Sequence, residues 1–231
     1  ANRKLVQAEK LASIGRIAAG IAHEIRNPLT SVKLNIQKLF QSNRLDEIEK
    51  EHLNLSQEGI TQMEKFIKEL LDFTRVYELN LNRFSIEQIL DESVKIIADS
   101  LELKKITLEK HYQQALPQVL VDGDKMRQVF LNLLRNAYEA VEEGGRIRVS
   151  LSLLKEDSGN KIKIDVADNG PGMPEEFREV IFEPFYTTKS TGIGLGMPNA
   201  RKIVEQHKGS IKVKENVKEG ASFEILIPCE G

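Results

Sequence analysis

The spacing of apolar residues changes once along this chain of 231 residues. As far as about Glu78, apolar residues recur at alternating steps of three and four, which is typical of helices that pack against other helices. Beyond that point, several short runs have an apolar residue at every second position, as β-strands do. We therefore expect a helical domain over residues 1–78, a linker over residues 79–83 and a domain of helices and strands over residues 84–231.

The first part contains two helical runs separated by residues 41–45, with Asp46 as a suitable N-cap for the second run. Because two helices alone cannot enclose such seams, we expect two hairpins to pair as a dimeric four-helix bundle, which makes the chain a homodimer. The seam positions are Leu11, Ile14, Ala18, Ile21, Ile25, Pro28, Val32 and Leu39 in the first run, with Asn35 or Ile36 before the last, and Leu53, Ser56, Ile60, Met63, Ile67, Leu70 and Thr74 in the second.

The second part begins with two helix signals. Ser85 and Gln88 form a capping-box pattern for a helix through about Ala98, and Asp122 is expected to cap a helix over residues 125–141. Alternating apolar residues then predict two antiparallel hairpins, one within residues 147–166 and the other within residues 211–227. The expected architecture is an α/β sandwich, in which helices cover one face of a mixed, mainly antiparallel sheet.

His23 is expected to face solvent, because it lies about 170° around the first helix from the mean direction of the seam. Glu24 can hydrogen-bond one ring nitrogen and leave the other free to act as a nucleophile. A zinc-protease site is excluded because the residue four positions after His23 is Asn27 and not a second histidine. The other three histidines are interpreted as surface residues without an assigned role; they are His52, His111 and His207.

Three clusters further along the chain indicate a nucleotide pocket. Asn132 and Asn136 are four residues apart, so they project from one face of a helix, and amide oxygens suit a Mg²⁺ ion that arrives with a triphosphate. Asp168 ends a predicted strand and precedes a turn with Gly170 and Gly172, where a carboxylate can accept a hydrogen bond from the amine of adenine. A tight turn with a solvated aspartate is the alternative interpretation of the last cluster.

The third cluster is a glycine-rich run, Gly192, Gly194 and Gly196, before a helix with Pro198 in its first turn and Gly209 beyond its end. Backbone amides at such a helix start favour phosphate. A Rossmann or P-loop fold is disfavoured, because no strand directly precedes the glycines and the Walker lysine is missing. The preceding residues, 182–189, combine aromatic residues with Lys189, which fits either a lid over the phosphates or an apolar patch packed on the domain.

Composition restricts the kinds of partner and the cellular compartment that we expect for this chain. The 33 basic and 35 acidic residues nearly cancel, so nothing favours nucleic-acid binding or a polybasic membrane anchor. Cys229 is the single cysteine, which excludes an internal disulfide and fits a reducing compartment. No apolar run approaches the length of a transmembrane helix. We expect this fragment to be cytoplasmic, with a parent protein that can be membrane-anchored upstream of it.

Together these motifs strongly resemble those of bacterial two-component sensor histidine kinases, over essentially the whole chain. Residues 23–29 resemble their H box, residues 132–136 their N box, residues 168–172 and 191–195 their two glycine boxes, and residues 182–185 their F box. The resemblance implies a dimerisation and histidine-phosphotransfer domain followed by an ATP-binding domain of the Bergerat type, shared with type II topoisomerases and heat-shock ATPase chaperones. It also implies ATP and Mg²⁺ as cofactors.

The resemblance assigns roles residue by residue. His23 accepts the γ-phosphate, Glu24 acts as the base, and Asn27 orients water for a phosphatase activity. Asn136 coordinates Mg²⁺, and Asp168 binds adenine. The implied nucleotide-binding residues are Asn132, Asn136, Asp168, Gly170, Gly172, Lys189, Thr191, Gly192, Gly194 and Leu195. The implied partners are a second copy of the chain, the receiver domain of a response regulator and, by similarity to the sporulation kinases, a small protein inhibitor of the hairpin.

Two positions depart from the family pattern. Ser190 stands where the second glycine box has its first glycine, and Glu139 replaces a basic residue that some relatives present to phosphate. Lys189 is the candidate replacement for that basic residue. Two other functions fit parts of the pattern: a dimeric scaffold that binds ATP without catalysis, and a Bergerat-type ATPase that drives a protein clamp.

Overall fold

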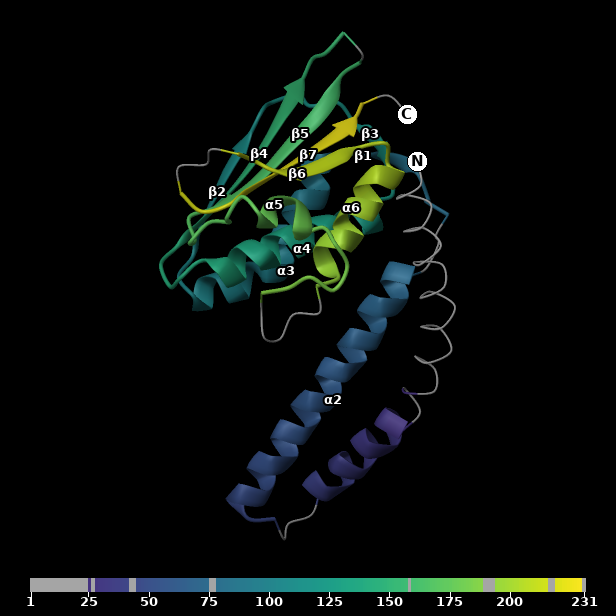
Figure 1. Ribbon diagram of the computed structural model, residues 1–231, viewed down its shortest axis with the longest axis vertical. Helices are drawn as coiled ribbons and strands as arrows, with labels where there is room; N and C mark the ends of the chain where they lie inside the picture. The colour runs from purple at the N-terminus through teal and green to yellow at the C-terminus, as the bar shows by residue number, and fades with distance from the viewer. Residues whose placement is uncertain are drawn as a thin grey trace. The chain divides into compact units, whose positions relative to one another are not determined.

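The computed structural model describes residues 25, 28–41, 45–74, 78–157, 159–188, 194–215 and 219–229 (Figure 1). The chain divides into two compact units, Ala1–Tyr77 and Glu78–Gly231. Each unit has its own hydrophobic cluster. None of the helices in the described ranges is long and apolar enough to cross a membrane.

The first unit contains a helical segment over residues 28–40 and the long helix α2, Glu47–Thr74. The predicted cap at the start of α2 is confirmed, because Oδ1 of Asp46 accepts from the Glu49 amide over 2.8 Å and Glu49 Oε2 accepts from the Asp46 amide over 2.9 Å. Lys33 forms an ion pair with Glu64 across the hairpin at 2.8 Å. This ion pair and a shared apolar cluster join the two helices.

Only part of the predicted seam is buried within the hairpin. The buried cluster consists of Leu29, Ile36, Ile60 and Ile67, with Phe40, Leu53 and Leu71 partly buried against it. Of these, Ile36, Leu53, Ile60 and Ile67 belong to the predicted seam, whereas Leu29, Phe40 and Leu71 do not. Other seam positions remain open, since Val32, Leu39 and Met63 are 48%, 49% and 54% exposed. The hairpin thus presents a second apolar surface that its own two helices do not cover.

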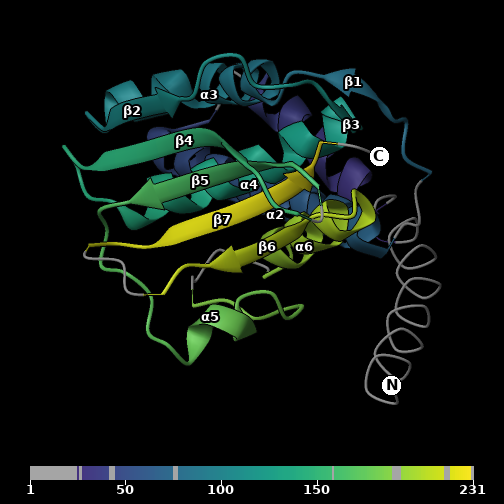
Figure 2. The same ribbon diagram turned by 90° about the horizontal axis from the view of Figure 1, so that it is seen from above.

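The second unit is built on a five-stranded sheet in the order β2-β4-β5-β7-β6 (Figure 2). Its strands are β2 Thr107–Tyr112, β4 Arg146–Leu154, β5 Lys161–Asp168, β6 Ser210–Val213 and β7 Ser222–Pro228. The β4–β5 and β6–β7 pairs are antiparallel, which confirms both predicted hairpins, and β2 pairs with β4 in parallel. The mixed, mainly antiparallel sheet is therefore as expected.

Three helices cover one face of this sheet (Figure 2). They are α3 Ile86–Leu103, α4 Gly123–Ala140 and α6 Gly196–Gln206, and the short helix α5 is Phe177–Val180. The predicted caps Ser85 and Asp122 both accept a hydrogen bond from the amide three residues later. Alternate strand residues such as Val149, Ile164 and Ile225 are fully buried beneath the helices.

The linker expected at residues 79–83 is in part a strand. Asn82–Phe84 forms β1, which pairs antiparallel with β3, Val119–Val121, in a separate two-stranded sheet. Three-residue strands carry too few alternations to be recognised from periodicity, and the partner of β1 lies almost forty residues away. No pattern in the sequence indicated this strand because its pairing is non-local, and the bounds of the linker remain a prediction.

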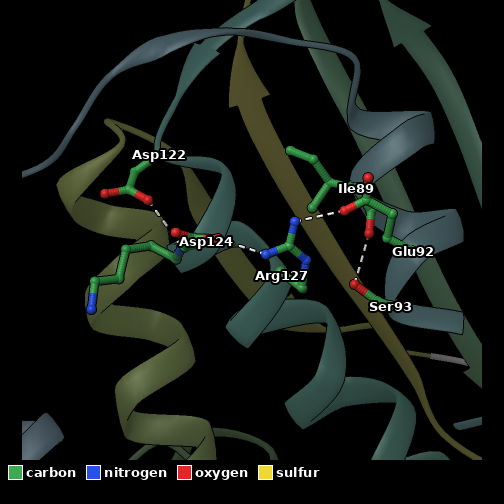
Figure 3. A network of polar contacts seen from close by, with 7 residues as sticks. Ile89, Glu92, Ser93, Asp122, Asp124 and Arg127 are labelled. Carbon is green, nitrogen blue, oxygen red and sulfur yellow. Dashed lines mark hydrogen bonds and ion pairs between the residues drawn. The ribbon is translucent and has the colours of Figure 1, made fainter. Parts of the chain in front are cut away.

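Polar side chains on the surface join α3 to α4. Figure 3 shows Arg127 of α4 between Asp124 on its own helix and Glu92 on α3, and both contacts are 2.6 Å long. The pKa of Arg127 is raised, first by its hydrogen bond to Glu92. Because both carboxylates are more than half exposed, such pairs contribute little to stability, about 0–1 kcal/mol each. They fix orientation more than they stabilise the fold.

Candidate functional site

Asp168 is a buried carboxylate at the end of β5. It is 8% exposed, and its Oδ1 accepts hydrogen bonds from the amides of Gly170 and Ala221 over 2.9 and 3.2 Å. Burial raises the pKa of Asp168 above its ordinary value, and these two bonds oppose the shift only in part. Within the part of the chain that the structure describes, both bonds end on Oδ1, so Oδ2 is available to a donor such as an amine.

The strand β7 and the residues before it hold Asp168 in place. The Asp168 amide donates to the carbonyl of Ala221 over 2.9 Å, while Ala221 donates back to the carboxylate. Gly220 lies against the backbone of Asp168 with a positive φ of 67°. Gly220 and Ala221 were not among the predicted site residues, because their contact with Asp168 spans more than fifty residues of sequence.

The two predicted asparagines lie on α4, as their spacing indicated. Nδ2 of Asn132 donates to the carbonyl of Gly196, at the start of α6, over 2.9 Å. That bond orients the side chain and leaves its Oδ1 as an acceptor. Asn136 lies one helical turn further along α4, and both residues are half-buried. The N-box pattern is thus brought next to the beginning of the helix that follows the second glycine-rich run.

The aromatic segment before that glycine-rich run is anchored to the domain. Phe182 is buried in the core, and the guanidinium carbon of Arg201 on α6 lies 5.1 Å from its ring centroid. The Phe185 amide donates to the carbonyl of Gly194 over 3.0 Å, which draws the two ends of the intervening segment together. Gly194 has a φ of 72°, and a β-carbon there would lie 2.5 Å from the carbonyl oxygen of Tyr186. Because Phe182 is buried, it fits the interpretation of residues 182–189 as an apolar patch packed on the domain.

An open cleft of about 470 Å³ borders the loop after Asp168. Its lining joins the loop to the ends of β6 and β7, and consists of Asn169, Gly170, Pro171, Gly172, Met173, Pro174, Arg178, Val213, Lys214, Glu219, Gly220 and Ala221. The lining includes two of the predicted residues, Gly170 and Gly172. Among the described residues it does not include Asp168 or the α4 asparagines, so this cleft adjoins the predicted site without coinciding with it.

Known protein families match both units. The family of histidine kinase-, DNA gyrase B- and HSP90-like ATPases matches residues 121–231, and the His Kinase A (phospho-acceptor) domain matches residues 13–77. In addition, the catalytic domain of the histidine kinase ThkA is 32% identical to this chain, which covers 97% of that structure with a TM-score of 0.60.

The chain belongs to the bacterial two-component sensor histidine kinases.

Curated sensor histidine kinases are similar along almost the whole chain. The signal transduction histidine-protein kinase AtoS of Escherichia coli (strain K12) is 32% identical over 98% of this chain, and sporulation kinase E of Bacillus subtilis (strain 168) is 32% identical over 97%. The sensor histidine kinase ZraS of Escherichia coli O157:H7 is 34% identical over 95% of this chain. The chain spans 36%, 30% and 47% of these three proteins, respectively.

Solved histidine kinases share the fold. The structure of full-length ShkA in complex with AMPPNP superposes with a TM-score of 0.79 at 26% identity, over 93% of this chain and 46% of ShkA. ThkA in complex with the response regulator protein TrrA gives a TM-score of 0.71 at 30% identity, over 96% of this chain and 64% of ThkA. The ATP-binding domain predicted from the glycine boxes is thus confirmed as a member of this ATPase family.

Several site residues expected of a histidine kinase lie outside the described residues. These are His23, Glu24, Asn27, Lys189, Thr191 and Gly192, together with the departure at Ser190. Within the described ranges, the fold brings Asp168, Asn132 and Asn136 into one unit, with Gly194 and Leu195 at the start of α6. Glu139 is exposed on α4. The assigned roles of all these residues remain predictions.

One histidine was misjudged. His207 was interpreted as a surface residue, but it is 6% exposed and its ring makes two hydrogen bonds, to the Asp122 amide and to the Ile203 carbonyl. His52 and His111 are exposed, in line with their interpretation. The burial of His207 depends on Asp122, which lies 85 residues away, so no local pattern in the sequence could have revealed it.

Proposed function

We propose that this chain is the transmitter part of a sensor histidine kinase, which transfers the γ-phosphate of ATP to His23 and then to an aspartate of a response regulator. The observation that carries the proposal is the buried carboxylate of Asp168, which has one oxygen held by backbone amides and lies in the same unit as the two asparagines of α4. The phospho-acceptor family match over residues 13–77 includes His23 and supports the acceptor assignment.

The proposed reaction is an in-line displacement at the γ-phosphorus. The free ring nitrogen of His23 attacks, the bond to the β,γ-bridging oxygen breaks, ADP leaves with that oxygen, and Glu24 takes the ring proton. The phosphorus–nitrogen bond then breaks as the phosphoryl group moves to the regulator carboxylate. We also propose that Asn27 orients a water molecule for hydrolysis of the phosphorylated regulator, as the family resemblance implies.

The donor set of the site fits Mg²⁺ that arrives with the nucleotide. No cluster of three or more His, Cys, Asp or Glu side chains that could cage a metal occurs within the described ranges. The amide oxygen of Asn132 is oriented by the bond from its own nitrogen to Gly196, and amide oxygens with phosphate oxygens and water are ligands that Mg²⁺ accepts. We propose that Asn136 binds the ion with Asn132 beside it. A bound Mg²⁺ would neutralise negative charge on the phosphates.

The uncovered apolar surface of the hairpin supports a homodimer. Four residues of α2 contribute exposed apolar side chains to this surface; they are Ile48, Leu55, Met63 and Phe66, which are 40–66% exposed. Together with Val32 and Leu39 they form a surface that the hairpin does not bury itself. Exposed apolar surface of this kind marks association sites. A second hairpin would cover it in a four-helix bundle.

The other partners are proposals that rest on relatives. A receiver domain is supported by the solved complex of ThkA with a response regulator protein. A small protein inhibitor of the hairpin is supported only by the resemblance to sporulation kinases. Cytoplasmic location of this fragment, and anchoring of its parent to a membrane, rest on composition and on the sensor kinases among its relatives.

Incubation with γ-labelled ATP and Mg²⁺ tests the proposal. We expect an acid-labile, alkali-stable phosphate on the wild-type chain and none on His23→Ala. The matched control is His52→Ala, since His52 is an exposed histidine on the same hairpin, and this variant should incorporate label as the wild type does. Label that persists in His23→Ala overturns the assignment of the acceptor.

The same assay separates the alternatives. Nucleotide binding without any incorporated label would support a scaffold that signals by shape alone. Steady release of phosphate that is unchanged by His23→Ala would support a clamp ATPase. Either result contradicts the proposed phosphotransfer.

A further inference from the structure

Helices α4 and α6 are joined by a hydrogen bond at each end of their contact. Near the middle of α4, Asn132 Nδ2 donates to the carbonyl of Gly196, which begins α6, over 2.9 Å. At the start of α4, the Asp122 amide donates to Nε2 of His207, which follows α6, over 2.9 Å. The two helices therefore run antiparallel, and a polar contact closes either end.

The ring of His207 is held in one orientation. Its Nδ1 lies 2.8 Å from the carbonyl oxygen of Ile203, which can only accept, so Nδ1 carries the proton and Nε2 accepts from Asp122. Burial lowers the pKa of His207, although the Ile203 carbonyl and the Asp122 carboxylate act in the other direction. The neutral ring is the form that fits both partners.

Asp122 also binds the segment at the beginning of the second unit. Its Oδ1 accepts from the Lys125 amide over 3.1 Å, and its Oδ2 accepts from the Asn80 amide over 3.0 Å. We call Asp122 with its three partners, His207, Lys125 and Asn80, the Asp122 node. Figure 3 shows Asp122 at the beginning of α4, with Asp124 between it and Arg127. The node thus joins the segment that leads into the unit to both helices.

Between the two polar contacts the side chains that the helices bury are mostly apolar, and Asn199 of α6 is a buried polar residue among them. Met126, Val129 and Leu133 of α4 are fully buried, as are Ala200 and Ile203 of α6, and all belong to one cluster. Apolar packing resists separation but has little directional preference, whereas hydrogen bonds fix direction. If the Asp122–His207 bond is lost, α6 can turn about the remaining contact at Asn132.

From this geometry we infer that His207 is a positioning residue for the nucleotide site, acting through Asp122 on the placement of α6 against α4. The inference rests on the proposed function, because α4 carries the predicted Mg²⁺ and nucleotide residues and α6 follows the second glycine box. His207 does not touch the nucleotide in this account. It fixes the distance between the N box and the residues that bind phosphate.

Two substitutions test the two hydrogen bonds of the His207 ring one at a time. In His207→Gln, the side-chain oxygen reaches the position of Nε2 and can still accept from the Asp122 amide. In His207→Asn, the shorter amide can serve the Ile203 carbonyl but cannot reach Asp122. The control is Val204→Ala, which makes a cavity in the same buried turn of α6 and leaves the node intact. Binding of trinitrophenyl-ATP with Mg²⁺ is followed by fluorescence on the whole chain, beside thermal unfolding of each variant.

We expect His207→Asn to bind the nucleotide about tenfold more weakly than the wild type, the effect of one buried donor left without an acceptor. His207→Gln should stay within about threefold of the wild type, and Val204→Ala should bind normally at a temperature where it is folded. Equal affinity of His207→Asn and Val204→Ala, at equal thermal stability, would show that His207 is only structural. Should His207→Asn not fold, loss of affinity in a folded His207→Gln overturns the inference.

The wild-type titration keeps this test apart from that of the proposed function. A wild-type chain that does not bind the nucleotide contradicts the proposed function itself. If the wild-type chain binds the nucleotide and all three variants bind it with the same affinity as the wild type, only the role of His207 is contradicted.

The role of the leading segment is tested separately. Asn80→Pro removes the amide that donates to Asp122, while Asn80→Ala keeps it. We expect nucleotide affinity to fall several-fold in the proline variant and to stay unchanged in the alanine variant. Equal affinity of the two variants would remove Asn80 from the node.

Discussion

A β-carbon on Gly220 would overlap the carbonyl oxygen of Asp168. The φ of 67° at Gly220 adds a second reason for glycine, because side chains disfavour that region by about 1–2 kcal/mol. The backbones of Gly220 and Asp168 are therefore in direct contact beside the carboxylate that is predicted to bind adenine. Any side chain at position 220 has to shift the backbone of residue 220 or of Asp168.

Gly220→Ala is predicted to weaken nucleotide binding by at least about tenfold, because it displaces Asp168 as well as straining the backbone. The matched control is Gly144→Ala, since Gly144 has a similar φ of 77° but nothing within 4 Å of the added carbon. Nucleotide titration and thermal unfolding are measured on both variants. If both variants lose the same amount of stability and bind the nucleotide with the same affinity, the contact between residue 220 and Asp168 does not contribute to nucleotide binding.

Asp168→Asn is predicted to reduce nucleotide affinity about a hundredfold, because the amide replaces one acceptor with a donor in a site built for a carboxylate. Asp165→Asn is the control. Asp165 lies on the same strand but on the opposite face of the sheet, where it pairs with Lys214 at 2.6 Å. Calorimetric titration with ATP distinguishes the two variants. Normal binding by Asp168→Asn would reject its assignment to adenine.

The stability of the second unit is predicted to fall below about pH 6.5, the ordinary pKa of histidine. Burial lowers the pKa of His207 in the fold, so in this range the unfolded chain binds a proton that the folded chain does not. The contribution is fully present above the unfolded pKa and is lost as the pH falls toward the lower, folded value. The unfolding temperature of wild type should drop more between pH 7.5 and 5.5 than that of His207→Gln. Parallel pH profiles would exclude His207 as the source.

Met63→Glu is predicted to dissociate the homodimer, weakening it by at least about a hundredfold, because an unpaired charge buried at an interface costs several kcal/mol. Leu103→Glu makes the same chemical change at an 85% exposed position in the other unit and should leave the dimer intact. Light scattering over a dilution series reports the mass. A fully dimeric Met63→Glu variant would place the interface elsewhere.

Local signals predicted local structure well. Ser85 and Asp122 cap their helices as expected, since capping depends on residues only three positions apart. The two antiparallel hairpins follow from alternation within short, connected segments. Asp168 was singled out as a candidate for the same reason, because it ends an alternating strand and precedes two glycines.

Features that depend on distant partners were missed. The strand β2 is polar along much of its length, as in Glu109, Lys110 and His111, and it is defined only by parallel pairing with β4. The half-buried carboxylate of Glu109 has a lowered pKa, first because of its hydrogen bond to Arg148 across that pair. His207 and Gly220 likewise acquire their roles through Asp122 and Asp168. No periodicity within the sequence reports such contacts.

The parallel pairing of β2 with β4 also has a dynamic consequence. Helix α4 lies in the connection between these strands, so it cannot leave its place without loosening the sheet on both sides. We expect its central amides to exchange hydrogen with solvent only through global unfolding. The short helix α5 has no buried residue and should exchange through local opening. Two helices of the same unit would then differ sharply, because α4 would open as rarely as the whole unit unfolds and α5 would open often.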